Sequence, residues 1–292
     1  MTAIATKQYW SDLLELTKPR ICVLALAMTA LGYFVGLRGP LSWSHFLITL
    51  AGTGLVGAGC GAINQWMERD IDALMHRTRE RPLPTGRLSG RTALLMGFST
   101  LVAGFALLLF CINAITAYLG LATFLTYLVA YTPLKRTSSV STLVGAIPGA
   151  MPPLMGWTAS FGSLAPEGWV LFAILFLWQV PHFLAIAWIY REDYARAGLP
   201  ILSVIDERGG ATSKQVLLYS SVLLPLSLLP TLMGVTGQIY FFGALVLGIW
   251  FFVVSVYLAI FRTKVYARKL FFVSIIYLPL LGILMVVDLL PR

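Results

Sequence analysis

Acidic and amide side chains recur at a fixed interval where a long apolar stretch ends. Asn64, Glu68 and Asp72 lie four residues apart, directly after the glycine-rich apolar run 46–63. At about 100° per residue, side chains at this spacing drift only about 40° per step, so the three share one face of a helix. Mg²⁺ usually takes one or two protein carboxylates and completes its shell with water and substrate phosphates. The spacing therefore predicts a magnesium site.

Four arginines follow this stripe, at Arg77, Arg79, Arg81 and Arg87. Arginine binds phosphate oxygens in a fork, so we expect a polyanion beside the metal, with Arg77 and Arg81 as the stronger candidates. The alternative is that these charges are solvated at the membrane surface and form local salt bridges. That alternative is strongest for Asp70, which lies about 200° away from the stripe.

The composition is that of a membrane protein. Hydrophobic residues make up 58% of the chain and charged residues 11%, with a mean hydropathy of +0.83. Soluble domains carry roughly 25% charged residues, and a membrane-spanning helix needs about 20 mostly apolar residues. Stretches of this kind lie at 21–37, 45–66, 92–111, 114–133, 139–158, 168–189, 215–235, 238–261 and 269–290.

We therefore expect an all-α membrane protein, with about nine transmembrane helices around a central cavity that opens to the cytoplasmic side. Residues 1–292 are expected to form one domain with a short N-terminal segment, 1–20. The stretch 139–158 contains three prolines, Pro148, Pro152 and Pro153, which predict an interrupted helix. The glycines between 52 and 61 predict close helix contacts in the bilayer.

The charges fit nine spans with a cytoplasmic N-terminus and a C-terminus on the opposite side. In that topology all of the 21 Lys and Arg residues except Arg38 and Arg292 are cytoplasmic, as the positive-inside rule requires. The net charge of +9 thus reflects topology, and nucleic acid is not an expected partner. A secondary transporter would place its acids near mid-membrane, whereas these acids gather at helix ends.

Two further segments carry polar side chains. Lys135 and Arg136 lie at a cytoplasmic helix end, while Gln179 and His182 lie within a span whose end carries Glu192 and Asp193. An ionisable residue at membrane depth is by default a candidate functional group. The two acidic helix ends could converge over one cavity, each holding a metal ion that shares one diphosphate.

These motifs resemble the UbiA-type intramembrane prenyltransferases, and in particular the branch that farnesylates heme. The resemblance rests on the N-x-x-x-E-x-x-x-D pattern at 64–72, YTPLKR at 131–136 with PGAMPPLMGW at 148–157, and WQVPHF at 178–183 with DYxxAGLPIL at 193–202. Two departures stand out: Glu68 replaces the more common Asp, and the second acidic segment lacks a D-x-x-x-D spacing.

The resemblance implies transfer of a farnesyl group from farnesyl diphosphate to the 2-vinyl group of protoheme IX, with water addition, giving heme O and diphosphate. It implies that Glu68 and Asp72, helped by Asn64, hold Mg²⁺, with Glu192 and Asp193 acting from the other side.

The same resemblance assigns roles to the remaining polar residues. Arg77, Lys135 and Arg136 would stabilise the leaving group, Arg81 and Gln179 would bind diphosphate or heme, and His182 would bind the heme iron or position the water. An aromatic quinone precursor is the alternative acceptor. The expected surroundings are the lipid bilayer of the cell inner membrane, with the downstream heme A synthase or the oxidase assembly machinery as candidate partners.

Overall fold

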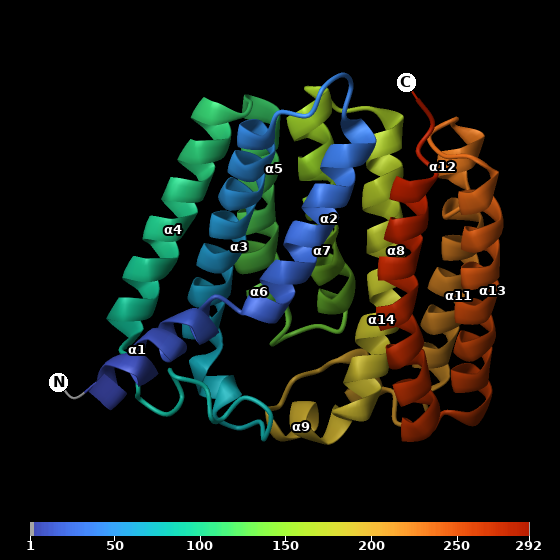
Figure 1. Ribbon diagram of the computed structural model, residues 1–292. Helices are drawn as coiled ribbons and strands as arrows, with labels where there is room; N and C mark the ends of the chain where they lie inside the picture. Colours follow the sequence, from blue (N-terminus) through green and yellow to red (C-terminus); the bar gives the residue numbers. More distant parts are fainter. Residues whose placement is uncertain (1–2, 292) are drawn as a thin grey trace.

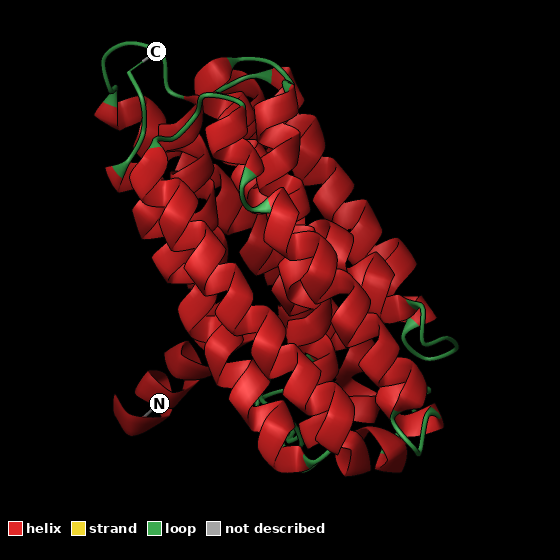
Figure 2. Ribbon diagram, turned by 90° about the vertical axis from the view of Figure 1, so that its right-hand side faces the viewer, coloured by secondary structure: helices red, strands yellow, loops and turns green. Residues whose placement is uncertain are grey.

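The structure, a computed structural model, describes residues 3–291, and within this range it is built from helices without a β-strand (Figures 1 and 2). The all-α membrane fold is therefore confirmed. The helices are α1 (Ala3–Leu16), α2 (Pro19–Gly36), α3 (Trp43–Asp72), α4 (Gly90–Cys111), α5 (Ala114–Phe124), the π-helix η1 (Leu125–Tyr131), α6 (Thr132–Leu134), α7 (Ser141–Phe161), α8 (Pro166–Ile189), α9 (Arg191–Arg196), α10 (Leu202–Ile205), α11 (Gly210–Leu226), α12 (Leu229–Leu232), α13 (Gln238–Phe261) and α14 (Lys264–Val287).

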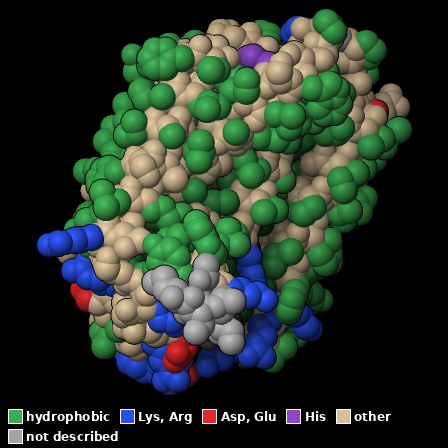
Figure 3. Space-filling model, turned by 60° about the vertical axis from the view of Figure 1, so that its left-hand side comes forward, with side chains coloured by type: hydrophobic (Ala, Val, Ile, Leu, Met, Phe, Trp, Pro, Cys, Tyr) green, Lys and Arg blue, Asp and Glu red, His purple; other side chains and the backbone are tan. Residues whose placement is uncertain are grey.

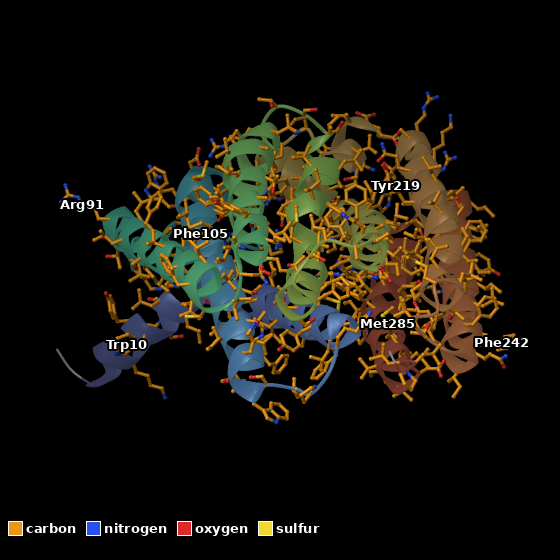
Figure 4. The ribbon with its side chains drawn as sticks, turned by 90° about the horizontal axis from the view of Figure 1, so that it is seen from above. Trp10, Arg91, Phe105, Tyr219, Phe242 and Met285 are labelled. Carbon is orange, nitrogen blue, oxygen red and sulfur yellow. The ribbon has the colours of Figure 1, made fainter. Side chains whose placement is uncertain are left out.

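The long helices form one bundle. In Figure 1, α3, α4 and α5 lie on one side, α11, α13 and α14 on the other, and α2, α7 and α8 between them. Seen from above, Arg91 near the start of α4 and Phe242 on α13 lie at opposite edges of the bundle (Figure 4). Within the described residues, eight candidate spans are long and apolar enough to cross a membrane.

The helix α7 differs from its prediction. The prediction that its prolines interrupt the helix is wrong, because α7 runs unbroken over Ser141–Phe161 with Pro148, Pro152 and Pro153 inside it. All three prolines are buried, so neighbouring helices cover the backbone that the missing N–H groups leave open. The eight candidate spans do not include α7, and the count of nine spans stays a prediction.

Glycines allow the central helices to approach closely. A Cβ atom at Gly32 of α2 would lie 1.9 Å from Pro153 O of α7, and one at Gly156 of α7 would lie 1.9 Å from Thr29 O of α2. The same kind of contact joins α3 to α4, where a Cβ at Gly59 would lie 2.6 Å from Gly97 O. Small residues at such crossings maximise packing where lipid supplies no hydrophobic driving force between helices.

Lys and Arg side chains gather at one end of the bundle (Figure 3). We call this the basic end; it includes the loops 73–89, 135–140 and 197–201 and the helices α1 and α9 (Figure 1). The C-terminus lies at the opposite end (Figure 1). The end of α3 that carries the acidic stripe is therefore also the end at which the cations collect.

Replacement of Gly32 by Ala should destabilise the bundle, because the new Cβ would collide with backbone of α7. We expect the free energy of unfolding in detergent to fall by about 1–3 kcal/mol, the usual effect of overpacking. Gly54→Ala is the matched control, since its Cβ would meet only the flexible Leu26 side chain at 3.4 Å. Equal stability of the two variants by thermal unfolding would contradict this account of the α2–α7 contact.

Candidate active site

The side chains of the acidic stripe, at the basic end of α3, are buried. Asn64, Glu68 and Asp72 are only 1%, 3% and 1% exposed. Asp70 points away from them, with 60% of its side chain exposed, and pairs with Arg136. The stripe is therefore a feature of the interior, and Asp70 is a solvated charge outside it.

Each buried carboxylate of the stripe is paired with a base from another part of the chain. Lys135 Nζ donates to Glu68 Oε1 at 2.9 Å, and Arg81 Nη1 donates to Asp72 Oδ2 at 2.7 Å. Burial opposes the charged form of Lys135, but the neighbouring Tyr131 and Glu68 oxygens raise its pKa above the ordinary value. Since an unpaired buried charge is costly, these ion pairs are what permits carboxylates at this depth.

A third cation, Lys18, reaches the stripe from the residue before α2. Its Nζ donates to Asn64 Oδ1, and also to Tyr127 Oη at 3.2 Å. Its backbone lies in the left-handed region at φ 53° and ψ 59°, a conformation that costs free energy and often marks functional sites. Burial lowers the pKa of Lys18 to about 8, and nearby Glu68 opposes this shift.

The π-helix η1 lies beside the stripe. Tyr127 and Tyr131 stack along it with ring centroids 5.5 Å apart and planes 8° from parallel. The next residue, Thr132, accepts a hydrogen bond from Asn64 Nδ2 at 2.9 Å, and Lys135 Nζ lies 6.0 Å from the Tyr131 ring centroid. Short π-helical segments are rare and frequently occur at functional sites.

Four residues of this network have no role predicted from the sequence: Lys18, Tyr127, Tyr131 and Thr132. Lys18 counts only as one of the cytoplasmic charges of the predicted topology, and residues 114–133 are predicted only to span the membrane. The available signal was the quoted motif at 131–136, which begins within the apolar stretch 114–133 and brings polar side chains into its end.

The second acidic segment lies at the same end of the molecule but pairs with its own bases. Glu192 binds Lys264 at 2.7 Å with 74% of its side chain exposed, and Asp193 binds Arg196 at 3.0 Å. Within residues 3–291, no group of three or more His, Cys, Asp or Glu side chains could hold a metal ion. A second metal ion at Glu192 and Asp193 therefore stays a prediction.

Apolar side chains nevertheless bring the two acidic segments together. Ile71 and Met75, at the end of α3, pack with Ala197, Leu199 and Ile201 from the loop after α9. The second segment thus covers the end of the stripe helix.

The remaining predicted residues lie in three different settings. Arg136 makes a forked pair with Asp70, at 2.8 and 2.6 Å, on the exposed side of α3. The Arg77 guanidinium lies 5.7 Å from the Tyr190 ring centroid. Gln179 is buried, and its Nε2 donates to Leu175 O at 3.0 Å, while His182 bonds to Ser274 of α14.

The stripe fits a magnesium ion. Glu68 and Asp72 lie on consecutive turns, and the ion pairs engage one oxygen of each, Oε1 of Glu68 and Oδ2 of Asp72. Two carboxylates, with water and substrate phosphates, are the usual complement of Mg²⁺ in proteins. The cations Lys18, Arg81 and Lys135 around them suit a diphosphate.

The structure is thus a helical membrane bundle in which buried carboxylates and bases are paired at one end. Residues 25–276 match the UbiA prenyltransferase family, and the chain belongs to that family. Among its relatives, the protoheme IX farnesyltransferase of Solibacter usitatus is 49% identical over 286 residues, which cover 95% of this chain and 98% of the relative. The protoheme IX farnesyltransferase of Myxococcus xanthus is 44% identical, with 97% and 96% covered.

Solved structures share the fold. A digeranylgeranylglyceryl phosphate synthase superposes with a TM-score of 0.82 at 19% identity, covering 96% of this chain and 98% of that one. A UbiA homolog from Archaeoglobus fulgidus bound to GPP and Mg²⁺ gives a TM-score of 0.66 at 20% identity, with 94% and 99% covered.

Loss of one partner of the Glu68–Lys135 pair should destabilise the protein more than loss of both. Lys135→Met leaves the Glu68 carboxylate buried without its base, so we expect a loss of about 3 kcal/mol in the free energy of unfolding. The double variant Glu68→Gln with Lys135→Met removes both charges and should recover most of it. Additive effects in a double-mutant cycle would contradict the buried pair.

Proposed function

We infer that the chain transfers a farnesyl group from farnesyl diphosphate to the 2-vinyl group of protoheme IX, with water addition, giving heme O and diphosphate. The observation that carries this inference is the buried stripe of Asn64, Glu68 and Asp72, surrounded by Lys18, Arg81 and Lys135. The names of relatives up to 49% identical over nearly the whole chain support the heme acceptor.

Glu68 and Asp72 would hold Mg²⁺, and Asn64 lies on the same face to orient the bound diphosphate. When bound, Mg²⁺ supplies positive charge that neutralises the diphosphate as its bond to the farnesyl carbon breaks. The homolog bound to GPP and Mg²⁺ supports a metal-dependent reaction. Glu192 and Asp193 are the candidates for a second ion.

The bases of the site would stabilise the leaving group. In the structure, Lys135 and Arg81 neutralise carboxylates. With Mg²⁺ held by the carboxylates, the N–H groups of the two side chains would be available to the phosphate oxygens, together with those of Lys18 and Arg77. Fixed donors aimed at developing negative charge lower the barrier most in a site that excludes bulk water.

The stacked rings of Tyr127 and Tyr131 would shield the allylic cation that forms as diphosphate leaves with the bonding electrons. The terminal carbon of the heme vinyl group then donates its π electrons to C1 of the farnesyl chain. The positive charge passes to the vinyl carbon beside the porphyrin, where a water oxygen adds and releases a proton. The product is the hydroxyethylfarnesyl group of heme O.

The proposal takes residues 1–292 as one prenyltransferase domain in the cell inner membrane. The basic end would face the cytoplasm, in accord with the positive-inside rule, with the N-terminus on that side and the C-terminus opposite. Heme O must be passed to a heme-modifying enzyme or to a terminal oxidase, so heme A synthase and the oxidase assembly machinery are the partners we expect. Transfer to an aromatic quinone precursor is the alternative activity.

Asp72→Asn should abolish heme O formation while leaving the protein folded, because an amide is a poor ligand for Mg²⁺ in place of a carboxylate. We expect turnover to fall by at least about 100-fold. Asp70→Asn is the matched control, since Asp70 is two residues away but exposed, and it should retain most activity. Equal turnover of both variants, measured as heme O by liquid chromatography and mass spectrometry, would refute the assignment of the stripe.

Removal of divalent cations should stop the reaction, because the two carboxylates would then remain tied to Lys135 and Arg81. We expect EDTA to eliminate diphosphate release and added Mg²⁺ to restore it. Ca²⁺, which is larger and favours more ligands, should restore it less well. Undiminished diphosphate release in EDTA would argue against a metal-dependent site.

A further inference from the structure

Ser274 of α14 fixes the position of His182 on α8, away from the acidic stripe. His182 Nδ1 lies 2.7 Å from Ser274 Oγ, and Ser274 is 0% exposed. A second bond joins the helices at the same residue, because Trp178 Nε1 donates to Ser274 O at 2.9 Å. One serine of α14 thus holds two consecutive turns of α8.

The hydrogen bonds of Ser274 determine which nitrogen of His182 carries the proton. Ser274 Oγ also lies 2.6 Å from Phe271 O. A carbonyl oxygen can only accept, so the serine hydrogen points to Phe271 and the Oγ lone pairs face His182. With the serine hydrogen on Phe271 O, the arrangement assigns the proton of a neutral His182 ring to Nδ1 and the lone pair to Nε2.

Aromatic rings hold the plane of His182. The Trp178 ring stacks on it with centroids 4.7 Å apart and planes 18° from parallel. The Phe271 ring stacks at 5.3 Å and 24°. His182 remains partly exposed, so the two stacked rings fix its plane without burying it completely.

The other two histidines of the chain lack this setting. His45 bonds through Nδ1 to Tyr33 Oη at 2.9 Å near the start of α3, at the end of the bundle opposite the basic end. His76 is exposed in the loop that follows α3. A neutral imidazole whose Nδ1–H is hydrogen-bonded is the form in which histidine commonly binds metals through Nε2, and the bonded partner strengthens the ligand.

We propose that Ser274 is a positioning residue that holds His182 as a neutral imidazole with its lone pair on Nε2, and that this nitrogen binds the iron of the heme acceptor. The identity of the ligand rests on the proposed function, since heme is its substrate. The tautomer rests only on the contacts of Ser274 and is testable without any substrate.

The first test uses the substrate-free protein. Histidine labelled with ¹⁵N should give, for His182, the NMR chemical shifts of an Nδ1-protonated neutral ring. Ser274→Ala removes the acceptor and should shift the ring toward the Nε2-protonated form. Ser255→Ala is the matched control, because Ser255 is also 0% exposed, bonds to a carbonyl of its own helix, and links α13 to Ser220 of α11.

The second test adds heme. Binding of ferric heme to the wild-type protein should produce the absorption spectrum of a histidine-ligated iron, and Ser274→Ala should weaken heme binding by about 10- to 100-fold. The KM for farnesyl diphosphate should be unchanged in that variant. Ser255→Ala should match the wild type in both measurements.

The outcomes separate the possible failures. Wild-type NMR shifts of an Nε2-protonated ring, or no change in Ser274→Ala, would overturn the positioning role whatever the acceptor is. An unchanged heme spectrum with slower turnover in Ser274→Ala would overturn iron ligation and assign His182 to the water that adds to the product. A wild-type protein that makes no heme O while its His182 shifts are as expected would refute the proposed function and not the positioning of His182.

Discussion

The neutralisation of buried carboxylates at the end of α3 is the interaction on which the rest of the site depends. Glu68 and Asp72 lie where water cannot solvate them, and each is held by a base that arrives from another segment of the chain. Lys135 follows α6 and Arg81 lies in the loop after α3, while Lys18 precedes α2 and binds Asn64. A buried charge without a partner costs several kcal/mol, so the two ion pairs hold the segments that carry Lys135 and Arg81 against one face of α3. The Lys18–Asn64 hydrogen bond holds a third segment there. The same ion pairs hold the Lys135 and Arg81 side chains beside the acidic stripe.

Helix packing fixes the frame within which these charges meet. The glycine contacts between α2 and α7 bring backbone against backbone, so the start of α2, where Lys18 lies, is set relative to the rest of the bundle. On the other side, α8 and α14 are joined at Ser274 by two hydrogen bonds from α8. The acidic stripe and His182 therefore lie on different helices, α3 and α8, and helix packing sets the positions of both helices.

Much of the fold follows from the sequence, and so does the shared helix face of the acidic stripe. Composition alone predicts an all-α membrane protein, and the four-residue spacing of Asn64, Glu68 and Asp72 predicts a shared face because helical geometry leaves no other arrangement. Partners distant in sequence do not follow. The local sequence around Lys18 is the same whether this lysine only sets the topology or also bonds to Asn64. The π-helix η1 lies in an apolar stretch whose sequence does not distinguish a π-helix from an α-helix. The pairing of Glu192 with Lys264 depends on where α14 begins, which local spacing does not reveal. The predicted break in α7 is wrong because the free-energy cost of a proline inside a helix depends on whether neighbouring helices cover the exposed backbone, and the local sequence does not show those neighbours.

The products formed from two different acceptors distinguish heme farnesylation from prenylation of a quinone precursor. The purified protein in detergent micelles would receive farnesyl diphosphate and Mg²⁺ with either protoheme IX or 4-hydroxybenzoate, and the products would be resolved by mass spectrometry. The account predicts heme O together with an equal amount of diphosphate from the heme reaction, and no prenylated product from 4-hydroxybenzoate. A prenylated hydroxybenzoate, with no product from heme, would contradict it.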